Sequence, residues 1–166
     1  MIIRGVRPGE MDAVGELRVA AYQAQNHLAV KPDYADTLRV LGADGGGKVL
    51  VAVEDGRTAP MLGTVMVERW HAASEVARGE DEGEIRALAV APQAQGRGVG
   101  RALVRAAIDQ AVAWGMRQLV LSTQPAMTAA QRLYLAEGFV RLPERDWAPA
   151  PGVTLLAFGR PLAGQK

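Results

Sequence analysis

The run Gln-Gly-Arg-Gly-Val-Gly at residues 95–100 combines residue types that can bind an anion. Its three glycines lack Cβ atoms, so the backbone can approach a ligand closely. The run stands directly before a segment with the apolar spacing of a long helix, and the first turn of a helix presents unpaired N–H groups at the positive end of its dipole. Phosphate is the natural ligand of such a loop. Arg97 and Arg101 can add charge-assisted contacts to phosphate oxygens, with solvated surface positions as the alternative for both.

Two other phosphate-binding motifs do not fit this sequence. The dinucleotide fingerprint G-x-G-x-x-G fails because Arg101 takes its last position and no acidic residue closes the next strand, LVLST. The stretch Gly42–Lys48 has Walker spacing, but Val49 replaces the Ser or Thr that holds magnesium. It also follows a helical segment and precedes a strand, the reverse of the required order. We therefore interpret it as a connecting loop.

The sequence offers little for nucleophilic or metal chemistry. It has no cysteine, which removes disulfides, thiolate metal sites and a cysteine nucleophile. Its two serines, Ser74 and Ser122, do not lie in a G-x-S-x-G elbow, which argues against a serine hydrolase. His27 and His71 are far apart, and neither has a histidine four residues away. We therefore expect no metal site.

Strands and helices are expected to alternate around the glycine run. The predicted strands are Ile2–Val6, Val49–Glu54, Leu62–Glu68, Glu84–Val90, Leu119–Thr123, Phe139–Leu142 and Leu155–Gly159. The predicted helices start at Pro8, at Asp33 as a cap, at Gly98 and at Ala126, and the last two end at Gly115 and Gly138. A turn is expected over residues 54–60 and a loop over residues 73–83. The Pro-rich stretch 143–153 can form either a loop over the acceptor side or a surface turn that packs Trp147. This mixture predicts an α/β fold.

Composition limits the class of protein. The 166 residues suit a single domain, residues 1–166, and 49% hydrophobic with 22% charged residues is ordinary for a globular chain. A net charge of +1, with basic residues scattered among acidic ones, does not indicate a nucleic-acid partner. No apolar run approaches the ~20 residues of a membrane span, and the N-terminus lacks the apolar core of a signal peptide. We expect a cytoplasmic protein with no membrane partner.

Two motifs carry a resemblance to a known family. The stretch from Glu84 to Leu103, EIRALAVAPQAQGRGVGRAL, is similar to the central motif of the GNAT superfamily, the acyl-CoA-dependent N-acetyltransferases. The later stretch AAQRLYLAEGF resembles that family's closing motif. The matching positions are Gln95, Gly98 and Gly100 in the first motif and Ala130, Tyr134, Gly138 and Phe139 in the second. The order and spacing of the two motifs strengthen the resemblance.

The resemblance implies a mixed, mostly antiparallel central sheet with splayed strands and helices on both faces. It also implies that acetyl-CoA lies across the splayed strand ends, with its pyrophosphate on the glycine run and its pantetheine arm on the preceding strand. The implied cofactor-binding residues are Leu88, Ala89, Val90, Gln95, Gly96, Arg97, Gly98, Val99, Gly100, Arg101 and Ala130. One position departs from the family pattern: Met127 stands where many members carry an Asn that contacts the cofactor.

Glu84 is the candidate general base. An alkylamine with a pKa near ~10 is mostly protonated at neutral pH, so a group that removes its proton favours attack on a thioester. Some GNAT members keep a catalytic glutamate at the position of Glu84, acting directly or through water. The alternative is a surface glutamate at a strand end beside the acidic stretch GEDEGE.

Tyr134 is the candidate general acid. A phenol with a pKa near ~10 is protonated at rest and can give its proton to the departing thiolate. The alternative is an aromatic side chain that only packs in the core.

The resemblance therefore predicts an enzyme, an acyltransferase that moves an acetyl group from acetyl-CoA to a primary amine of a small molecule or peptide. Residues on segments that border the acceptor pocket in the family are Tyr22, His27, Tyr34, Trp70 and His71. A CoA-binding regulatory module of the same fold, without turnover, is the alternative function. The resemblance also allows a homodimer.

Overall fold

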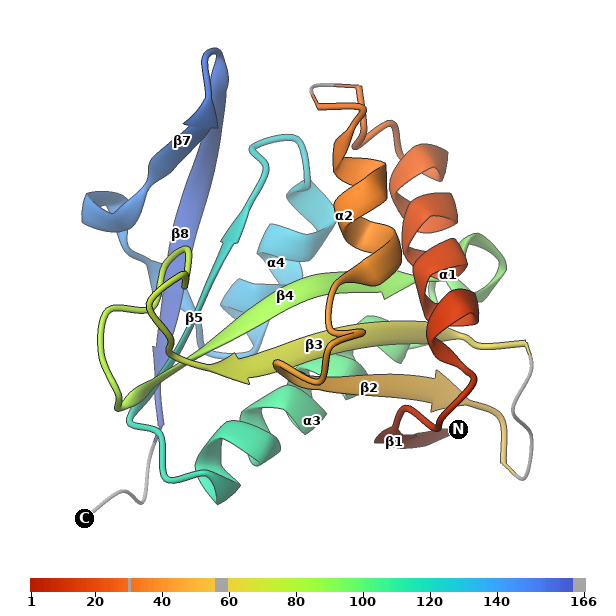
Figure 1. The fold of residues 1–166 in the computed structure, drawn as a ribbon. Helices are drawn as coiled ribbons and strands as arrows, with labels where there is room; N and C mark the ends of the chain where they lie inside the picture. Colours follow the sequence, from red (N-terminus) through yellow and green to blue (C-terminus); the bar gives the residue numbers. More distant parts are fainter. Residues whose placement is uncertain (30, 56–59, 163–166) are drawn as a thin grey trace. The chain divides into compact units, whose positions relative to one another are not determined.

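Strands and helices are mixed along the chain (Figure 1). The computed structural model describes residues 1–29, 31–55 and 60–162. The strands are β1 Ile2–Gly5, β2 Lys48–Val53, β3 Gly63–Arg69, β4 Glu82–Val90, β5 Gln118–Thr123, β6 Val140–Arg141, β7 Trp147–Ala150 and β8 Val153–Pro161. The helices are α1 Met11–Ala24, α2 Tyr34–Val40, α3 Val99–Ala113 and α4 Thr128–Ala136, with short 3-10 helices η1 Pro92–Ala94 and η2 Pro143–Arg145.

Within the described ranges, a mixed sheet joins the strands in the order β1-β2-β3-β4-β5-β8-β6, and β7 pairs with β8. β1 pairs antiparallel with β2, and β8 pairs antiparallel with β5, β6 and β7. β4 and β5 run parallel, with Glu82–Glu84 opposite Gln118–Val120. The predicted α/β fold with a mostly antiparallel central sheet is confirmed.

The chain divides into two compact units whose residues interleave in sequence. The first unit comprises Met1–Met66 and Ala87–Ala107, and the second comprises Val67–Arg86 and Ile108–Lys166. β3, β4 and α3 each begin in one unit and end in the other. A single domain over residues 1–166 stays a prediction.

In the first unit, α1 and α2 lie side by side (Figure 1). Their close approach needs a glycine, because a Cβ atom on Gly15 would lie 2.5 Å from the carbonyl oxygen of Arg39. Buried side chains of both helices pack against Ala87 of β4. On β3, a Cβ atom at Gly63 would lie 2.9 Å from the side chain of Leu103 in α3. Helices therefore cover both faces of the strands in this unit.

In the second unit, the side chains of successive residues of β8 point to opposite faces of the sheet, as in any strand. Phe158 packs against Tyr134 of α4, with ring centroids 6.2 Å apart. Its neighbour Ala157 is buried with Val120 of β5 and with Val76. Val76 belongs to the connection between β3 and β4, so this connection covers the face opposite α4.

Three local predictions need correction. β4 begins at Glu82, two residues earlier than expected, because its first residues pair with β5. The Pro-rich stretch 143–153 is not only a loop, since it contains η2 and strand β7, which pairs with β8. Asp33 precedes α2 but has helical backbone angles and makes no side-chain capping bond. Part of the predicted turn over residues 54–60 falls on residues 56–59, outside the described residues.

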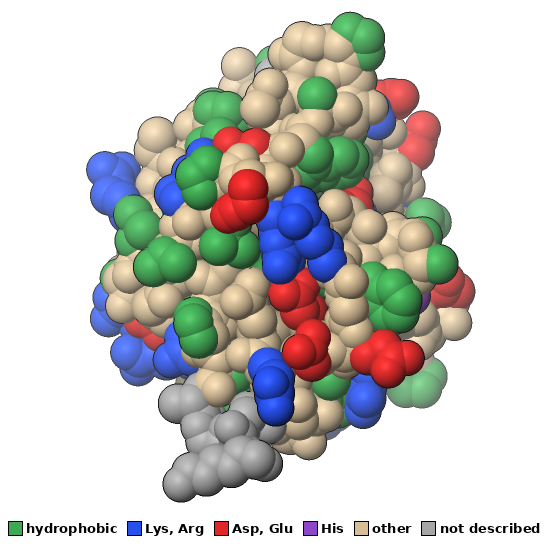
Figure 2. All heavy atoms as spheres, turned by 90° about the vertical axis from the view of Figure 1, so that its left-hand side faces the viewer, with side chains coloured by type: hydrophobic (Ala, Val, Ile, Leu, Met, Phe, Trp, Pro, Cys, Tyr) green, Lys and Arg blue, Asp and Glu red, His purple; other side chains and the backbone are tan. Residues whose placement is uncertain are grey.

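The surface carries charges of both signs. Figure 2 shows acidic and basic side chains intermixed with apolar ones on one face. No helix of the described ranges is long and apolar enough to cross a bilayer.

Candidate active site

The glycine loop lies in the first unit, between η1 and α3. Gly96 and Gly98 both have φ +78°, a left-handed conformation that glycine adopts without strain. A Cβ atom at either position would meet no atom within 4 Å, so the backbone conformation, not crowding, favours glycine here. The carbonyl of Gly98 accepts the N–H of Ala102 at 3.1 Å, one of the first bonds at the start of α3. α3 begins at the buried Val99, and the N–H groups of its first residues point out of the N-terminal end of the helix.

Two polar side chains of the loop are engaged within the same unit. The guanidinium of Arg97 forms an ion pair with Glu54, which follows β2. The amide of Gln95 donates to the carbonyl of Val90 at 3.2 Å. Arg101 is exposed on the first turn of α3. A phosphate bound by Arg97 must therefore compete with the carboxylate of Glu54.

A β-bulge lies in β4, upstream of the glycine loop. The backbone N–H of Trp70 donates to the backbone carbonyl of Glu82 at 3.1 Å, and the backbone N–H of Ala91 donates to the backbone carbonyl of Leu62 at 2.8 Å. Between these bonds β3 advances eight residues, from 62 to 70, whereas β4 advances nine, from 82 to 91. The extra residue of β4 coincides with Ala87, whose φ of +55° is unusual for a residue with a Cβ atom. This bulge has no signal in the sequence, because EIRALAV contains no glycine.

The predicted pantetheine-binding residues follow the bulge. Leu88 and Val90 are half-buried, whereas Ala89 is buried between them. The carbonyl oxygen of Ala89 would lie 2.9 Å from a Cβ atom on Gly63, so Gly63 permits the close approach of β3. Because the bulge adds one residue, the alternation of side chains between the two faces of the sheet shifts by one position after Ala87.

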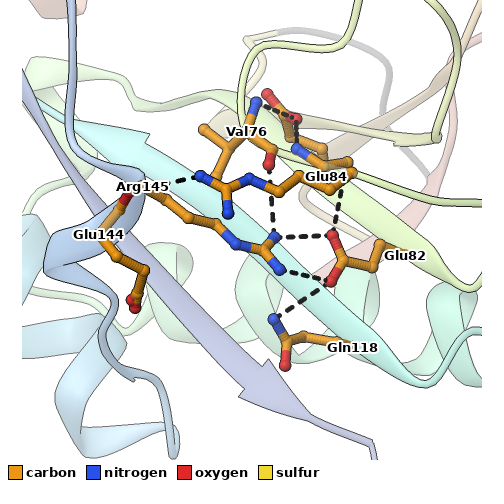
Figure 3. A network of polar contacts seen from close by, with 8 residues as sticks. Val76, Glu82, Glu84, Gln118, Glu144 and Arg145 are labelled. Atoms are coloured by element: carbon orange, nitrogen blue, oxygen red, sulfur yellow. Dashed lines mark hydrogen bonds and ion pairs between the residues drawn. The ribbon is translucent and has the colours of Figure 1, made fainter.

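Glu84 is buried in the second unit, with 1% of its surface exposed. Its Oε1 accepts the N–H groups of Val76 and Ala77, both at 2.9 Å (Figure 3). Burial raises the pKa of the Glu84 carboxyl above its usual value, and the two N–H bonds oppose this shift. Glu75 raises the pKa further, whereas Arg86 lowers it. The interpretation of Glu84 as a surface glutamate is therefore wrong.

Glu82, two residues before Glu84, is held by a guanidinium fork (Figure 3). Arg145 donates to its two carboxylate oxygens at 2.7 and 2.9 Å and to the carbonyl of Val76 at 3.3 Å. Gln118 of β5 lies 3.4 Å from Oε2 of the same carboxylate. Burial alone would raise the pKa of Glu82, but Arg145 and a backbone N–H outweigh burial and lower it. The two glutamates of one strand thus have pKa values displaced in opposite directions.

A further buried carboxylate, Glu68 in β3, was not predicted. The Trp70–Glu82 pairing sets Glu68 opposite Glu84 on the same face of the two strands. Glu68 is 3% exposed, and its Oε1 lies 3.3 Å from Nε2 of His71. The sequence does carry a signal for it, because Glu68 directly follows the apolar residues Val65, Met66 and Val67 of the same strand, where a charge is unexpected.

Tyr134 lies in α4, in the helix predicted there, and is buried, with 5% of its surface exposed. Its ring packs against Phe139 and Phe158, with centroids 5.6 and 6.2 Å away. Burial raises the pKa of its hydroxyl, which keeps the phenol protonated at neutral pH. Ala130 lies one turn earlier and is half-buried. Met127, the departure from the family pattern, precedes α4, and its sulfur lies 3.3 Å from Oγ1 of Thr123.

The residues predicted to contact the acceptor form two groups. In the first unit, the ring of Tyr22 lies 6.2 Å from His27 and 6.1 Å from Tyr34. Burial lowers the pKa of His27. In the second unit, Trp70 and His71 follow β3, and the Nδ1 atom of His71 accepts the N–H of Ala73 at 3.2 Å. A neutral His71 therefore carries its proton on Nε2, the atom near Glu68.

Comparisons with known proteins agree on one class. The chain matches the Acetyltransferase (GNAT) family over residues 11–139. Mycothiol acetyltransferase from Cellulomonas flavigena is 35% identical over 116 residues, which cover 68% of this chain and 32% of that protein. The chain matches about a third of the length of such curated relatives.

Solved structures share the fold. An acetyltransferase of the GNAT family from Desulfovibrio desulfuricans superposes with a TM-score of 0.76 at 21% identity, covering 98% of this chain and 99% of that one. An acetyltransferase from Salmonella typhimurium, solved with its cofactor acetyl-CoA, superposes with a TM-score of 0.67 at 22% identity, covering 100% and 96%. Fold and matches together define an acetyltransferase domain. The chain belongs to the GNAT acetyltransferase family.

Proposed function

We propose that this chain transfers an acetyl group from acetyl-CoA to a primary amine of a small molecule or peptide. The observation that carries the proposal is the environment of Glu84. Its carboxyl is buried, its pKa is raised, and both hydrogen bonds fall on Oε1. A carboxylate held in this way keeps Oε2 for a proton, and a base with a raised pKa works closer to neutral pH.

The glycine loop fits the pyrophosphate of acetyl-CoA. The left-handed Gly96 and Gly98 have open space where Cβ atoms would stand, and the first N–H groups of α3 point out of the N-terminal end of the helix. Arg97 and Arg101 would contribute positive charge, and Leu88–Val90 would offer backbone groups to the pantetheine arm. The cofactor supplies the activated acetyl thioester.

The protons are assigned to two side chains of this protein. Glu84 takes one proton from the ammonium group of the acceptor, directly or through water, and the freed nitrogen forms the new bond to the acetyl carbon. As the carbon–sulfur bond breaks, Tyr134 gives its proton to the sulfur. The nitrogen loses its second proton to solvent, so the products are the neutral amide and CoA. Glu84 then releases its proton to solvent, and Tyr134 takes one back.

The acceptor is proposed as a primary amine, and the candidate residues for its binding are aromatic and histidine side chains of each unit. These are Tyr22, His27 and Tyr34 in the first unit and Trp70 and His71 in the second. Because curated relatives are named mycothiol acetyltransferases, unacetylated mycothiol is the first acceptor to test.

Release of CoA thiol in the presence of an amine panel tests the function. The panel contains unacetylated mycothiol, alkyl diamines, amino-acid amides and short peptides, and mass spectrometry identifies the acetylated product. Glu84→Gln is expected to lower kcat/KM by ~10²-fold or more, with the Kd for CoA unchanged. Tight CoA binding without turnover across the whole panel would instead support a CoA-binding module.

A further inference from the structure

One peptide group connects Arg145 to Glu84. The carbonyl of Val76 accepts a hydrogen bond from Nη1 of Arg145 at 3.3 Å, and the next N–H, of Ala77, donates to Oε1 of Glu84 at 2.9 Å (Figure 3). These two groups belong to the same planar peptide unit. The direction of the carbonyl therefore fixes the direction of the N–H.

Arg145 is itself fixed in place. Its fork holds Glu82 at 2.7 and 2.9 Å, and its side chain is only 15% exposed. Glu82 also accepts the N–H of Arg78 at 2.9 Å. Three consecutive N–H groups, those of residues 76–78, thus donate to two carboxylates of β4. A cation on the Val76 carbonyl also polarises the peptide and strengthens its N–H as a donor.

We propose that Arg145 is a positioning residue for Glu84, holding the Val76–Ala77 peptide so that its N–H binds Oε1 and leaves Oε2 to take the proton of the acceptor amine. The inference rests on the proposed function, in which Glu84 is the base. It adds a residue of η2, which neither sequence motif contains. Arg145 acts on Glu84 through the peptide and through the charge of Glu82, so it need not touch either substrate.

Removal of Arg145 changes Glu84 in a defined direction. The N–H bonds that favour the carboxylate weaken, and Glu82 loses the cation that balances its charge, so both changes raise the pKa of Glu84. Charged groups near Glu84 come from its own strand, the β3–β4 connection, β3 and η2. They are Glu82, Arg86, Glu75, Glu68 and Arg145.

Titration of the Glu84 side-chain carboxyl by ¹³C NMR tests the inference without turnover. The Glu84 signal is assigned by its loss in Glu84→Gln. Arg145→Gln is expected to move the Glu84 midpoint, and the acidic limb of kcat/KM, to higher pH by roughly half to one pH unit. Arg145→Lys keeps a charge but not the planar fork, so a smaller shift in the same direction is expected. Should Arg145→Gln fail to fold, Arg145→Lys carries the test.

Arg141 supplies a matched control. Arg141 lies in β6, donates to both carboxylate oxygens of Asp146 at 2.7 and 2.8 Å, and donates to the carbonyl of Ala157 in β8 at 2.8 Å, an arrangement like that of Arg145. Arg141→Gln is expected to lower the Tm without moving the Glu84 titration. An unmoved titration in the folded Arg145 variants would overturn the inference. Full activity of Glu84→Gln would instead reject Glu84 as the base, a separate result, while the NMR titration still tests the link between Arg145 and Glu84.

Discussion

Burial raises the pKa of both Glu84 and Tyr134. The consequence differs, because Glu84 is proposed to accept a proton and Tyr134 to donate one. A carboxylate with a raised pKa holds a proton more strongly and so becomes a better base near neutral pH. A phenol with a raised pKa stays protonated and gives its proton only to a strong acceptor. A thiol has an ordinary pKa of about 8.5, below that of a phenol, so the transfer becomes easier where burial raises the pKa of the departing thiol as well.

The variant Tyr134→Phe distinguishes the proposed role of Tyr134 as a general acid from a role in core packing alone. Phenylalanine keeps the ring that packs against Phe139 and Phe158, so the Tm is expected to change little. Loss of the hydroxyl is expected to lower kcat by roughly 10²-fold or more, the usual range for a general acid. Steady-state kinetics and thermal unfolding of the same preparation check both points. A variant with the kcat of the parent would leave Tyr134 as a packing residue.

At the residue scale, the sequence predicts the types of groups better than their surroundings. Tyr134 and Glu84 follow from motif position, and both prove to be buried. Arg145 lies in a Pro-rich stretch that reads as a loop, so its fork onto Glu82, 63 residues away, has no local signal. Glu68, unlike Arg145, has a local signal, because a charged residue that directly follows Val65, Met66 and Val67 within a strand is unexpected.

At the scale of elements, periodicity predicts the helices and strands, whereas long-range pairing decides their details. The apolar spacing identifies α3 and the left-handed Gly115 at its end. The bulge at Ala87 and the start of β4 at Glu82 depend on the register with β3 and β5. The residues of β4 alone do not determine how it pairs with β3 and β5, so neither detail can be predicted from the sequence of β4.

Gly98 and Gly115 flank α3 and form a matched pair. Both have φ +78°, and at both a Cβ atom would meet open space. Alanine at either position is therefore expected to lower the free energy of unfolding by a similar amount, about 1–2 kcal/mol, from backbone strain alone. Only Gly98→Ala is expected to weaken CoA binding, by roughly tenfold, because only Gly98 lies in the proposed pyrophosphate loop. Calorimetric titration with CoA and urea unfolding compare the two, and equal Kd values would reject the loop assignment.

At the scale of the whole molecule, the two buried glutamates of β4 act on stability in opposite senses. The pKa of Glu84 is raised in the folded chain, so folding costs free energy once the pH is high enough to ionise it. The pKa of Glu82 is lowered by Arg145, so its ionised form stabilises the folded chain above the unfolded pKa. The contribution of Glu82 is lost as the pH falls, whereas the cost of Glu84 disappears.

Glu84→Gln is therefore expected to raise the Tm at pH 8 while abolishing most activity. The carbonyl oxygen of glutamine can still accept the N–H groups of Val76 and Ala77, and no buried charge remains. A gain of about 1 kcal/mol corresponds to roughly 2–4 °C for a chain of this size. The gain should shrink toward zero as the pH falls through the unfolded value of 4.5, where Glu84 is protonated in both states. Glu82→Gln is the matched control, with a lower Tm than the parent at pH 8. A stabilising effect of Glu82→Gln, or a destabilising one of Glu84→Gln, would contradict the opposite pKa shifts that Arg145 gives to Glu82 and burial gives to Glu84.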